Sequence, residues 1–525
     1  MAFVSLRFII FLIVLLTAYY LFPRKHQWLL LLAGSYVFYA YANPFYLIFL
    51  LLSTVTTYLC GVWMGREDEA LCGELAAHRE VLSKEEKRAR KAMTQKRKKQ
   101  VMAICLVFNL LILGLLKYTN FFLENMNLFL RAGGSDSLIP RVNWLLPLGI
   151  SFYTFMTIGY CVDVYRGICE PQKDFFKYAL FVSYFPQITQ GPINRYSDME
   201  GRLYGEHSFD WQRCKEGGYR ILTGLFKKLV IAERLAVYVD RVFGMPEAYG
   251  SMTILFAAVF YAIQIYCDFS GYMDIVLGIS ELFGIRMAEN FNKPFFSKSI
   301  PEYWRRWHMT LNIWFKDYLY YPVIRSEFCT KIGKKLGKRV SKEAGRLVPP
   351  VVGLLAVWFL TGLWHGASWH YVAHGLYHGT IIIFGILFGS VYKRLRETLH
   401  IRDDSKTYHV FQMVRTFLLV DISFILFRAS SVSDALFMMK QIFFYMDISI
   451  SALKDAILPF TEDNTAVAYF GVAAAAILLL FLAEVLDYNG KDTVKKHRYL
   501  SGAVMIVLIL LFGIFGQSEF IYMQY

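Results

Sequence analysis

Residues 348–370 read VPPVVGLLAVWFLTGLWHGASWH and contain the features that decide how the chain folds. The first part is an apolar run close to the roughly 20 residues that a transmembrane helix needs. It ends at His365 and His370, although ionisable groups are rare at membrane depth and mark functional positions there. Comparable apolar runs recur between residues 8 and 517. The sequence therefore predicts an all-α, polytopic integral membrane protein.

The composition supports this fold class. Hydrophobic residues make up 56% of the 525 residues and charged residues only 18%, whereas a soluble domain carries about 25% charge. The net charge is +15, but the cations lie in short loops, so we expect no nucleic-acid partner. The eight cysteines form no CxxC pair, which favours buried free thiols over a metal site.

The apolar runs predict membrane spans from end to end of the chain. We expect spans near 8–22, 27–42, 44–64, 101–124, 218–241, 251–284, 348–366, 371–391, 410–428, 466–487 and 499–517. The run at 251–284 is long, and polar residues at its middle predict a break in the helix. Shorter or more polar segments at 144–160, 175–190, 305–324 and 434–449 predict re-entrant or buried helices, whose backbone must be shielded from lipid.

The charged loops predict the orientation. Residues 66–99 hold eleven Lys or Arg against seven acids, and residues 325–346 hold eight against two. The positive-inside rule places the basic loops in the cytoplasm: about 66–100, 325–346, 393–406 and 491–498. Counting spans from these loops predicts that both termini lie on the outer side of the membrane. We expect residues 1–525 to form a single transmembrane domain.

The densest group of polar residues at membrane depth is the segment 303–321, YWRRWHMTLNIWFKDYLYY. If this segment is one helix, His308 and Asn312 share a face. The alternative is an interfacial helix with snorkelling cations and an aromatic belt. Candidate substrate-binding residues here are Arg305, Arg306, Trp307, Asn312 and Asp317.

A second group follows the apolar run of residues 348–363: Trp364 and His365, then three further histidines at 370, 374 and 378. Four histidines could suggest a metal site, but no carboxylate or cysteine lies nearby, so we expect no metal. A neutral imidazole suits general-base catalysis. The alternative is a structural histidine bonded to a backbone carbonyl.

Two further segments carry polar groups. Asp268, Ser270 and Asp274 lie at the middle of the 251–284 run, where the predicted break would line a polar cavity. Gln187 and Arg195 belong to the segment 185–195, in which two prolines and a glycine prevent a continuous helix. This segment predicts a polar turn at the end of a span.

The chain resembles the membrane-bound O-acyltransferase (MBOAT) family along its whole length. The resemblance rests on the segments described above and on three others: GISFY at 149–153, DVYRG at 163–167 and ENFNKPF at 289–295. The resemblance is closest to the branch of the alginate O-acetylation membrane subunit, with teichoic-acid D-alanyl transferases more distant. It implies a ring of tilted helices around a central tunnel in a bacterial inner membrane. The family's invariant histidine falls on His365 and its second polar position on His308, followed here by Thr310 where Ser is common.

The resemblance also implies a reaction. An acetyl or other short acyl group would pass from a cytoplasmic thioester, acetyl-CoA or an acylated carrier protein, to an extracytoplasmic hydroxyl, with no bound cofactor. His365 would accept the proton, His308 would polarise the carbonyl, and Arg305 or Arg306 would bind donor phosphates. The expected partners are a surface polysaccharide and an extracytoplasmic SGNH-type acetyltransferase or similar acceptor protein.

The C-terminal tail contains two tyrosines with a possible role in the reaction, and two other functions are alternatives to acetyl transfer. Tyr522 or Tyr525 could relay the acyl group, or the tail could serve as an aromatic anchor at the outer interface. D-alanyl transfer to wall polymers from a carrier protein is an alternative acyl transfer. A transporter, or a scaffold subunit of an export system, is the alternative from another class.

Overall fold

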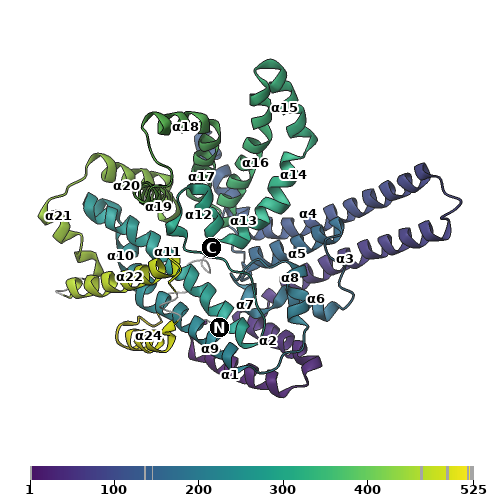
Figure 1. Ribbon diagram of the computed structural model, residues 1–525, viewed down its shortest axis with the longest axis horizontal. Coiled ribbons are helices and arrows are strands. Elements are labelled where there is room, and N and C mark those ends of the chain that lie inside the picture. The colour runs from purple at the N-terminus through teal and green to yellow at the C-terminus, as the bar shows by residue number, and fades with distance from the viewer. Residues whose placement is uncertain are drawn as a thin grey trace. The chain divides into compact units, whose positions relative to one another are not determined.

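The computed structural model describes residues 3–134, 138–144, 146–461, 465–491, 496–516 and 520. Over these residues the regular structure is helical, apart from one isolated bridge between Phe291 and Trp307. The chain divides into two compact units (Figure 1). Unit 1 is Met1–Gly217 with Ile279–Ala288, and unit 2 is Gly218–Gly278 with Glu289–Tyr525.

Unit 1 contains the first eight α-helices. They are α1 (Leu6–Leu21), α2 (Gln27–Ala42), α3 (Tyr46–Ala77), α4 (Lys84–Ala132), α5 (Ile150–Arg166), α6 (Phe175–Ser183), α7 (Phe185–Ile188) and α8 (Tyr196–Leu203). Helix α5 is buried along Ile150–Val164, because α3, α4 and α6 pack against it. It therefore forms the centre of unit 1.

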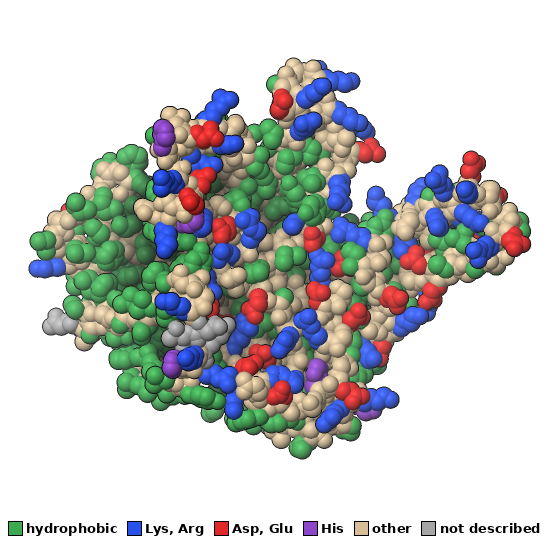
Figure 2. All heavy atoms as spheres, viewed as in Figure 1, with side chains coloured by type: hydrophobic (Ala, Val, Ile, Leu, Met, Phe, Trp, Pro, Cys, Tyr) green, Lys and Arg blue, Asp and Glu red, His purple; other side chains and the backbone are tan. Residues whose placement is uncertain are grey.

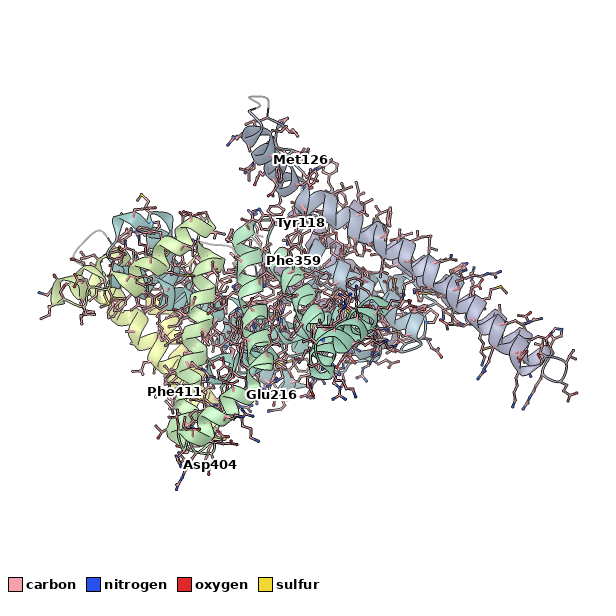
Figure 3. All side chains as sticks on the ribbon, turned by 90° about the horizontal axis from the view of Figure 1, so that it is seen from above. Tyr118, Met126, Glu216, Phe359, Asp404 and Phe411 are labelled. Carbon is pink, nitrogen blue, oxygen red and sulfur yellow. The ribbon has the colours of Figure 1, made fainter. Side chains whose placement is uncertain are left out.

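Helices α3 and α4 lie side by side as a long hairpin (Figure 1). Helix α4 has 49 residues, so at 1.5 Å per residue it is about 73 Å long, more than twice the roughly 30 Å hydrocarbon core of a bilayer. Figure 3 shows Tyr118 and Met126 along its C-terminal part. The Ser83 hydroxyl and the Glu86 carboxylate form a capping box at its N-terminus.

Unit 2 contains the remaining helices, except that the last four residues of α11 (Ser251–Leu282) belong to unit 1. Helix α9 (Trp211–Phe226) crosses the boundary at residue 217, and a π-helical turn (Lys227–Ala232) and α10 (Glu233–Gly244) follow it. Next come α11 (Ser251–Leu282), α12 (Ile300–Arg306), α13 (Met309–Phe315), α14 (Tyr321–Ile324), α15 (Glu327–Arg339), α16 (Lys342–His365), α17 (Trp369–Leu387) and α18 (Gly389–Thr398). The chain continues with α19 (Lys406–Arg428), α20 (Val432–Phe444), α21 (Ile450–Asp455), α22 (Ala466–Tyr488) and α24 (Arg498–Phe512).

Within the described residues, six helices are long and apolar enough to cross a membrane: α3, α4, α11, α16, α19 and α22. The pair α17 and α18, bent by 64°, makes a seventh if it counts as one span. Helices α1 and α24 are apolar but shorter. The predicted all-α membrane class is confirmed, whereas the central tunnel and the orientation stay predictions.

Two of the predicted basic loops lie largely in helices, one in each unit. In Figure 2, Lys and Arg side chains gather over the free end of the α3–α4 hairpin and over α15. On α15 the exposed cations include Lys331, Lys334, Lys335 and Lys338. Helix α15 packs against α16, where Gly333 approaches the Gly345 carbonyl oxygen so closely that a Cβ atom would lie 2.8 Å from it.

Candidate active site

His308 lies at a break between two short helices. Helix α12 ends at Arg306, Trp307 is extended, and His308 adopts a left-handed backbone with φ 47° and ψ 49° before α13 begins. The expected continuous helix over 303–321 is therefore wrong. A non-glycine residue in this conformation carries strain that surrounding contacts must hold, and such residues concentrate at functional sites.

The strained backbone is held by the segment that precedes α12. Asn292 N–H donates to the Arg306 carbonyl at 2.9 Å, and Met309 N–H donates to the Asn290 carbonyl at 3.0 Å. These bonds lie on either side of the bridge between Phe291 and Trp307. The backbone around His308 thus depends on partners distant in sequence rather than on local helix propensity.

The Asn290 side chain fixes the His308 ring. Its Oδ1 accepts hydrogen bonds from the Thr310 N–H at 3.0 Å and the Thr310 hydroxyl at 2.9 Å, so its Nδ2 must be the atom 3.3 Å from His308 Nδ1. Because Nδ2 only donates, Nδ1 accepts and the ring proton sits on Nε2. Burial lowers the pKa of His308, which lies outside the six candidate spans, to about 3. His308 is therefore a neutral imidazole that donates through Nε2.

His365 is the last residue of α16 and is 3% exposed. The Trp364 indole connects it to His308: its ring centroid lies 5.0 Å from the His365 ring and 5.5 Å from the His308 ring. The structure therefore brings the two predicted catalytic histidines to one buried indole. Phe269 of α11 packs edge-on against His308 at 4.9 Å and Phe427 of α19 against His365 at 5.1 Å.

Close packing of α16 on α17 sets the position of His365. A Cβ atom at Gly362 would lie 2.5 Å from the Tyr371 carbonyl oxygen, and one at Gly375 would lie 2.2 Å from the Trp358 carbonyl oxygen. Only glycine allows two helix backbones to approach this closely. These glycines and Asn290 are not among the site residues predicted from the sequence, although Asn290 belongs to the ENFNKPF segment that resembles the family pattern.

The chain is similar to known enzymes along most of its length. The profile of the membrane-bound O-acyltransferase family matches residues 172–336, a range that includes His308. The probable alginate O-acetylase AlgI of Azotobacter vinelandii is 32% identical, across 91% of this chain and 85% of the relative. The chain belongs to the membrane-bound O-acyltransferase family.

Other family members share parts of this similarity. The peptidoglycan O-acetyltransferase of Helicobacter pylori is 27% identical across 80% of this chain and 81% of its own. The teichoic acid D-alanyltransferase of Bacillus subtilis is 29% identical across 46% of this chain and 60% of its own. The predicted enzyme class is confirmed: the protein is a membrane-bound O-acyltransferase.

The remaining predicted residues of 303–321 have defined places in this O-acyltransferase. The Asn312 amide donates to the carbonyls of Trp304, Trp307 and His308 at 2.8, 2.8 and 3.0 Å, so it closes the break between α12 and α13. Arg306 pairs with Glu302 at 2.8 Å. Arg305 is exposed, and Asp317 is half-buried in a π-helical segment. Substrate contacts of these side chains stay predictions.

Helix α11 is continuous through Asp268, Ser270 and Asp274, so the expected break at its middle is wrong. The acids are instead paired with cations of α9 and of the π-helical turn that follows α9. Asp268 binds Lys228 at 2.7 Å, and Asp274 binds Lys227 at 2.8 Å and Arg220 at 3.2 Å. Ser270 is buried. A helix tolerates these charges because partners neutralise them.

The polar turn predicted at 185–195 is confirmed in unit 1, where α7 has only four residues. The Gln187 amide donates to the Phe181 carbonyl at 2.6 Å and accepts from Asn194 at 2.9 Å. Arg195 is the N-cap residue of α8. Tyr522 and Tyr525, the predicted acyl relay, lie outside the described residues.

The cysteines are free, and five of the eight are buried. Three could hold a soft metal ion: the sulfur atoms of Cys60, Cys105 and Cys161, on α3, α4 and α5, lie within 4.8 Å of one another. The Cys105 thiol donates to the Thr56 carbonyl at 3.6 Å, and the Cys161 thiol to the Thr57 carbonyl at 3.7 Å. The Cys105 and Cys161 thiols therefore each have a backbone acceptor.

Proposed function

We propose that this enzyme transfers an acetyl or other short acyl group from a cytoplasmic thioester to an extracytoplasmic hydroxyl, in the O-acetylation of a cell-surface polysaccharide. The supporting observation is the pair of buried imidazoles that meet at Trp364, one of them fixed as a neutral donor. The alginate O-acetylase similarity supports acetyl as the group and a polysaccharide as the acceptor.

The two imidazoles divide the chemistry. The acceptor oxygen attacks the thioester carbonyl carbon, and His365 takes the hydroxyl proton. The carbonyl oxygen gains negative charge and accepts a hydrogen bond from His308 Nε2–H, as a donor in an oxyanion hole does. The carbon–sulfur bond then breaks, and His365 returns its proton to the leaving thiolate. Both imidazoles end in their starting states.

The basic surfaces support a cytoplasmic donor. Acetyl-CoA and acylated carrier proteins are both acidic, and clustered cations raise the rate at which such partners associate. Positive loops at 66–100 and 325–346 also favour the cytoplasmic side. We accordingly place the protein in a bacterial inner membrane with both termini outside, beside an SGNH-type acetyltransferase or a similar acceptor protein.

Radiolabelled acetyl-CoA given to inverted membrane vesicles tests the proposal. We expect label on an acceptor inside the vesicles, and His308→Ala and His365→Ala should each lower transfer by about 10² to 10⁴, the usual contribution of acid–base catalysis. His370→Ala is the matched control, a buried histidine on α17 bonded to the Leu426 carbonyl. Transfer at the wild-type rate in His365→Ala vesicles, with protein present, contradicts the mechanism.

D-alanyl transfer from a carrier protein is the second candidate, and the teichoic acid D-alanyltransferase similarity favours it. The same vesicles separate the two, because a carrier-dependent enzyme ignores acetyl-CoA and accepts the aminoacylated carrier. A transporter or scaffold would tolerate loss of either imidazole.

A further inference from the structure

Three histidines of α17 donate hydrogen bonds to α19, and the bonds define their tautomers. His374 Nδ1 lies 2.9 Å from the Ser423 carbonyl oxygen, and His370 Nδ1 lies 3.2 Å from the Leu426 carbonyl oxygen. A carbonyl only accepts, so both Nδ1 atoms carry the ring proton. A neutral imidazole has one N–H, and each of these two rings therefore presents a lone pair on Nε2.

His378 binds the same serine in the opposite tautomer. The Ser423 hydroxyl donates to the Val420 carbonyl at 2.6 Å, so its oxygen accepts from His378 Nε2, 2.9 Å away. Ser423 is fully buried and receives two imidazole protons, one on its carbonyl and one on its hydroxyl. This serine therefore holds the His374 and His378 rings in fixed orientations.

His374 is the ring of this group that also contacts His365. The two ring centroids lie 6.0 Å apart with planes at 88°, and both rings pack on Phe427, at 5.1 Å for His365 and 5.0 Å for His374. His374 is 1% exposed. Imidazoles at this separation are within the reach of one N–H···N bond after a small rotation, or of one bridging water.

We propose that His374 is a positioning residue for His365: its Nε2 lone pair accepts the N–H of His365 and directs the other nitrogen of His365 towards the acceptor hydroxyl. This inference rests on the proposed acyl transfer. A carboxylate performs this task in the Ser-His-Asp triad. Here a neutral imidazole does so, polarised by the Ser423 carbonyl. His374 keeps its own proton throughout, because His365 passes the proton it accepts to the leaving thiolate.

Two substitutions of similar size separate this role from a structural one. The asparagine amide takes the place of Nδ1, so His374→Asn keeps the bond to Ser423 and loses the Nε2 acceptor proposed for His365. The glutamine amide oxygen takes the place of Nε2, so His374→Gln keeps the acceptor and loses the bond to Ser423. We expect the asparagine variant to lose at least tenfold in kcat with KM unchanged, and the glutamine variant to stay within about threefold of wild type.

The reversed order, with asparagine active and glutamine inactive, overturns the proposal, because it shows that only the Ser423 bond matters. Equal kcat values in the two variants also overturn it. His370→Asn and His370→Gln are matched controls on the same helix, where the histidine bonds a carbonyl and its ring packs on Tyr371. Neither control should change kcat by more than twofold.

A spectroscopic experiment tests the positioning without acyl transfer. Protein labelled with ¹⁵N-histidine in nanodiscs reports the tautomer of each ring, and His365→Ala assigns the His365 resonances. We expect one His365 tautomer in the wild type and in His370→Asn, and a mixture of both in His374→Asn. A single unchanged tautomer in His374→Asn overturns the proposal. If the mixture appears in protein that transfers no acyl group, the positioning holds and the proposed function fails.

Discussion

Replacing Lys228 should destabilise this protein far more than replacing either of its acidic partners. The Lys228 ammonium, 3% exposed, lies 2.7 Å from Asp268 of α11 and 2.7 Å from Glu233 of α10. The three charges sum to −1. Lys228→Met leaves two buried carboxylates without this cation. Asp268→Asn instead leaves Lys228 and Glu233 as a pair with no net charge. The new amide oxygen at position 268 still accepts a hydrogen bond from the Lys228 ammonium.

The charge count sets the magnitudes. Removing one partner of a buried ion pair costs about 3–5 kcal/mol, because the remaining charge stays desolvated. We expect Lys228→Met to reach or exceed this range, since two buried carboxylates each lose this cation. Asp268→Asn should cost about 1–2 kcal/mol, the difference between a charged and a neutral hydrogen bond. The triple variant Lys228→Met/Asp268→Asn/Glu233→Gln should regain part of the loss.

Thermal aggregation of the purified protein in one detergent measures this order. Lys331→Met is the matched control, an exposed lysine whose ammonium lies 3.0 Å from Glu327, and exposed pairs contribute about 0–1 kcal/mol. The midpoint should fall by several degrees for Lys228→Met and hardly at all for the control. A lower midpoint for Asp268→Asn than for Lys228→Met refutes the charge count.

Three further variants test the proposed reaction and its site. Asn290→Asp replaces the donor to His308 with an acceptor, moves the ring proton to Nδ1, and should lower acyl transfer at least 100-fold at normal protein level; unchanged transfer contradicts the tautomer. Gly375→Val places a side chain against a backbone carbonyl of α16 and should cost about 3 kcal/mol, seen as lost folded protein in size-exclusion chromatography. The double variant Tyr522→Phe/Tyr525→Phe keeps both rings, so an acyl relay predicts loss of transfer, and undiminished transfer eliminates the relay.

The spans of α19 and α22 were predictable because a helix that crosses lipid needs a continuous apolar run of about 20 residues. The expected span 466–487 matches α22 (Ala466–Tyr488) within one residue, and the expected span 410–428 ends with α19 (Lys406–Arg428), since length and apolar composition suffice there. The break expected at Asp268 failed for a tertiary reason. Its neutralising cation, Lys228, comes from a segment forty residues earlier, and no local pattern shows that pairing.

The break at His308 was invisible for a related reason. No proline or glycine interrupts 303–321, so local propensity predicts one helix. The left-handed residue is maintained instead by backbone bonds to Asn290 and Asn292, which precede α12. Asn290 and Asn292 belong to the ENFNKPF segment, which fits the family pattern. The sequence of that segment does not indicate that its backbone bonds Arg306 and Met309.

In the proposed reaction, the contacts of Asn290 support the division of roles that the family resemblance implies for the two histidines. An amide with its oxygen engaged by Thr310 can only donate to His308, so His308 Nδ1 cannot accept a substrate proton and Nε2 already carries one. Full burial keeps that ring neutral. A neutral imidazole in this state donates a hydrogen bond but is no base, which suits it to a carbonyl that gains negative charge. The base in the proposed reaction must therefore be the other imidazole at Trp364, that of His365.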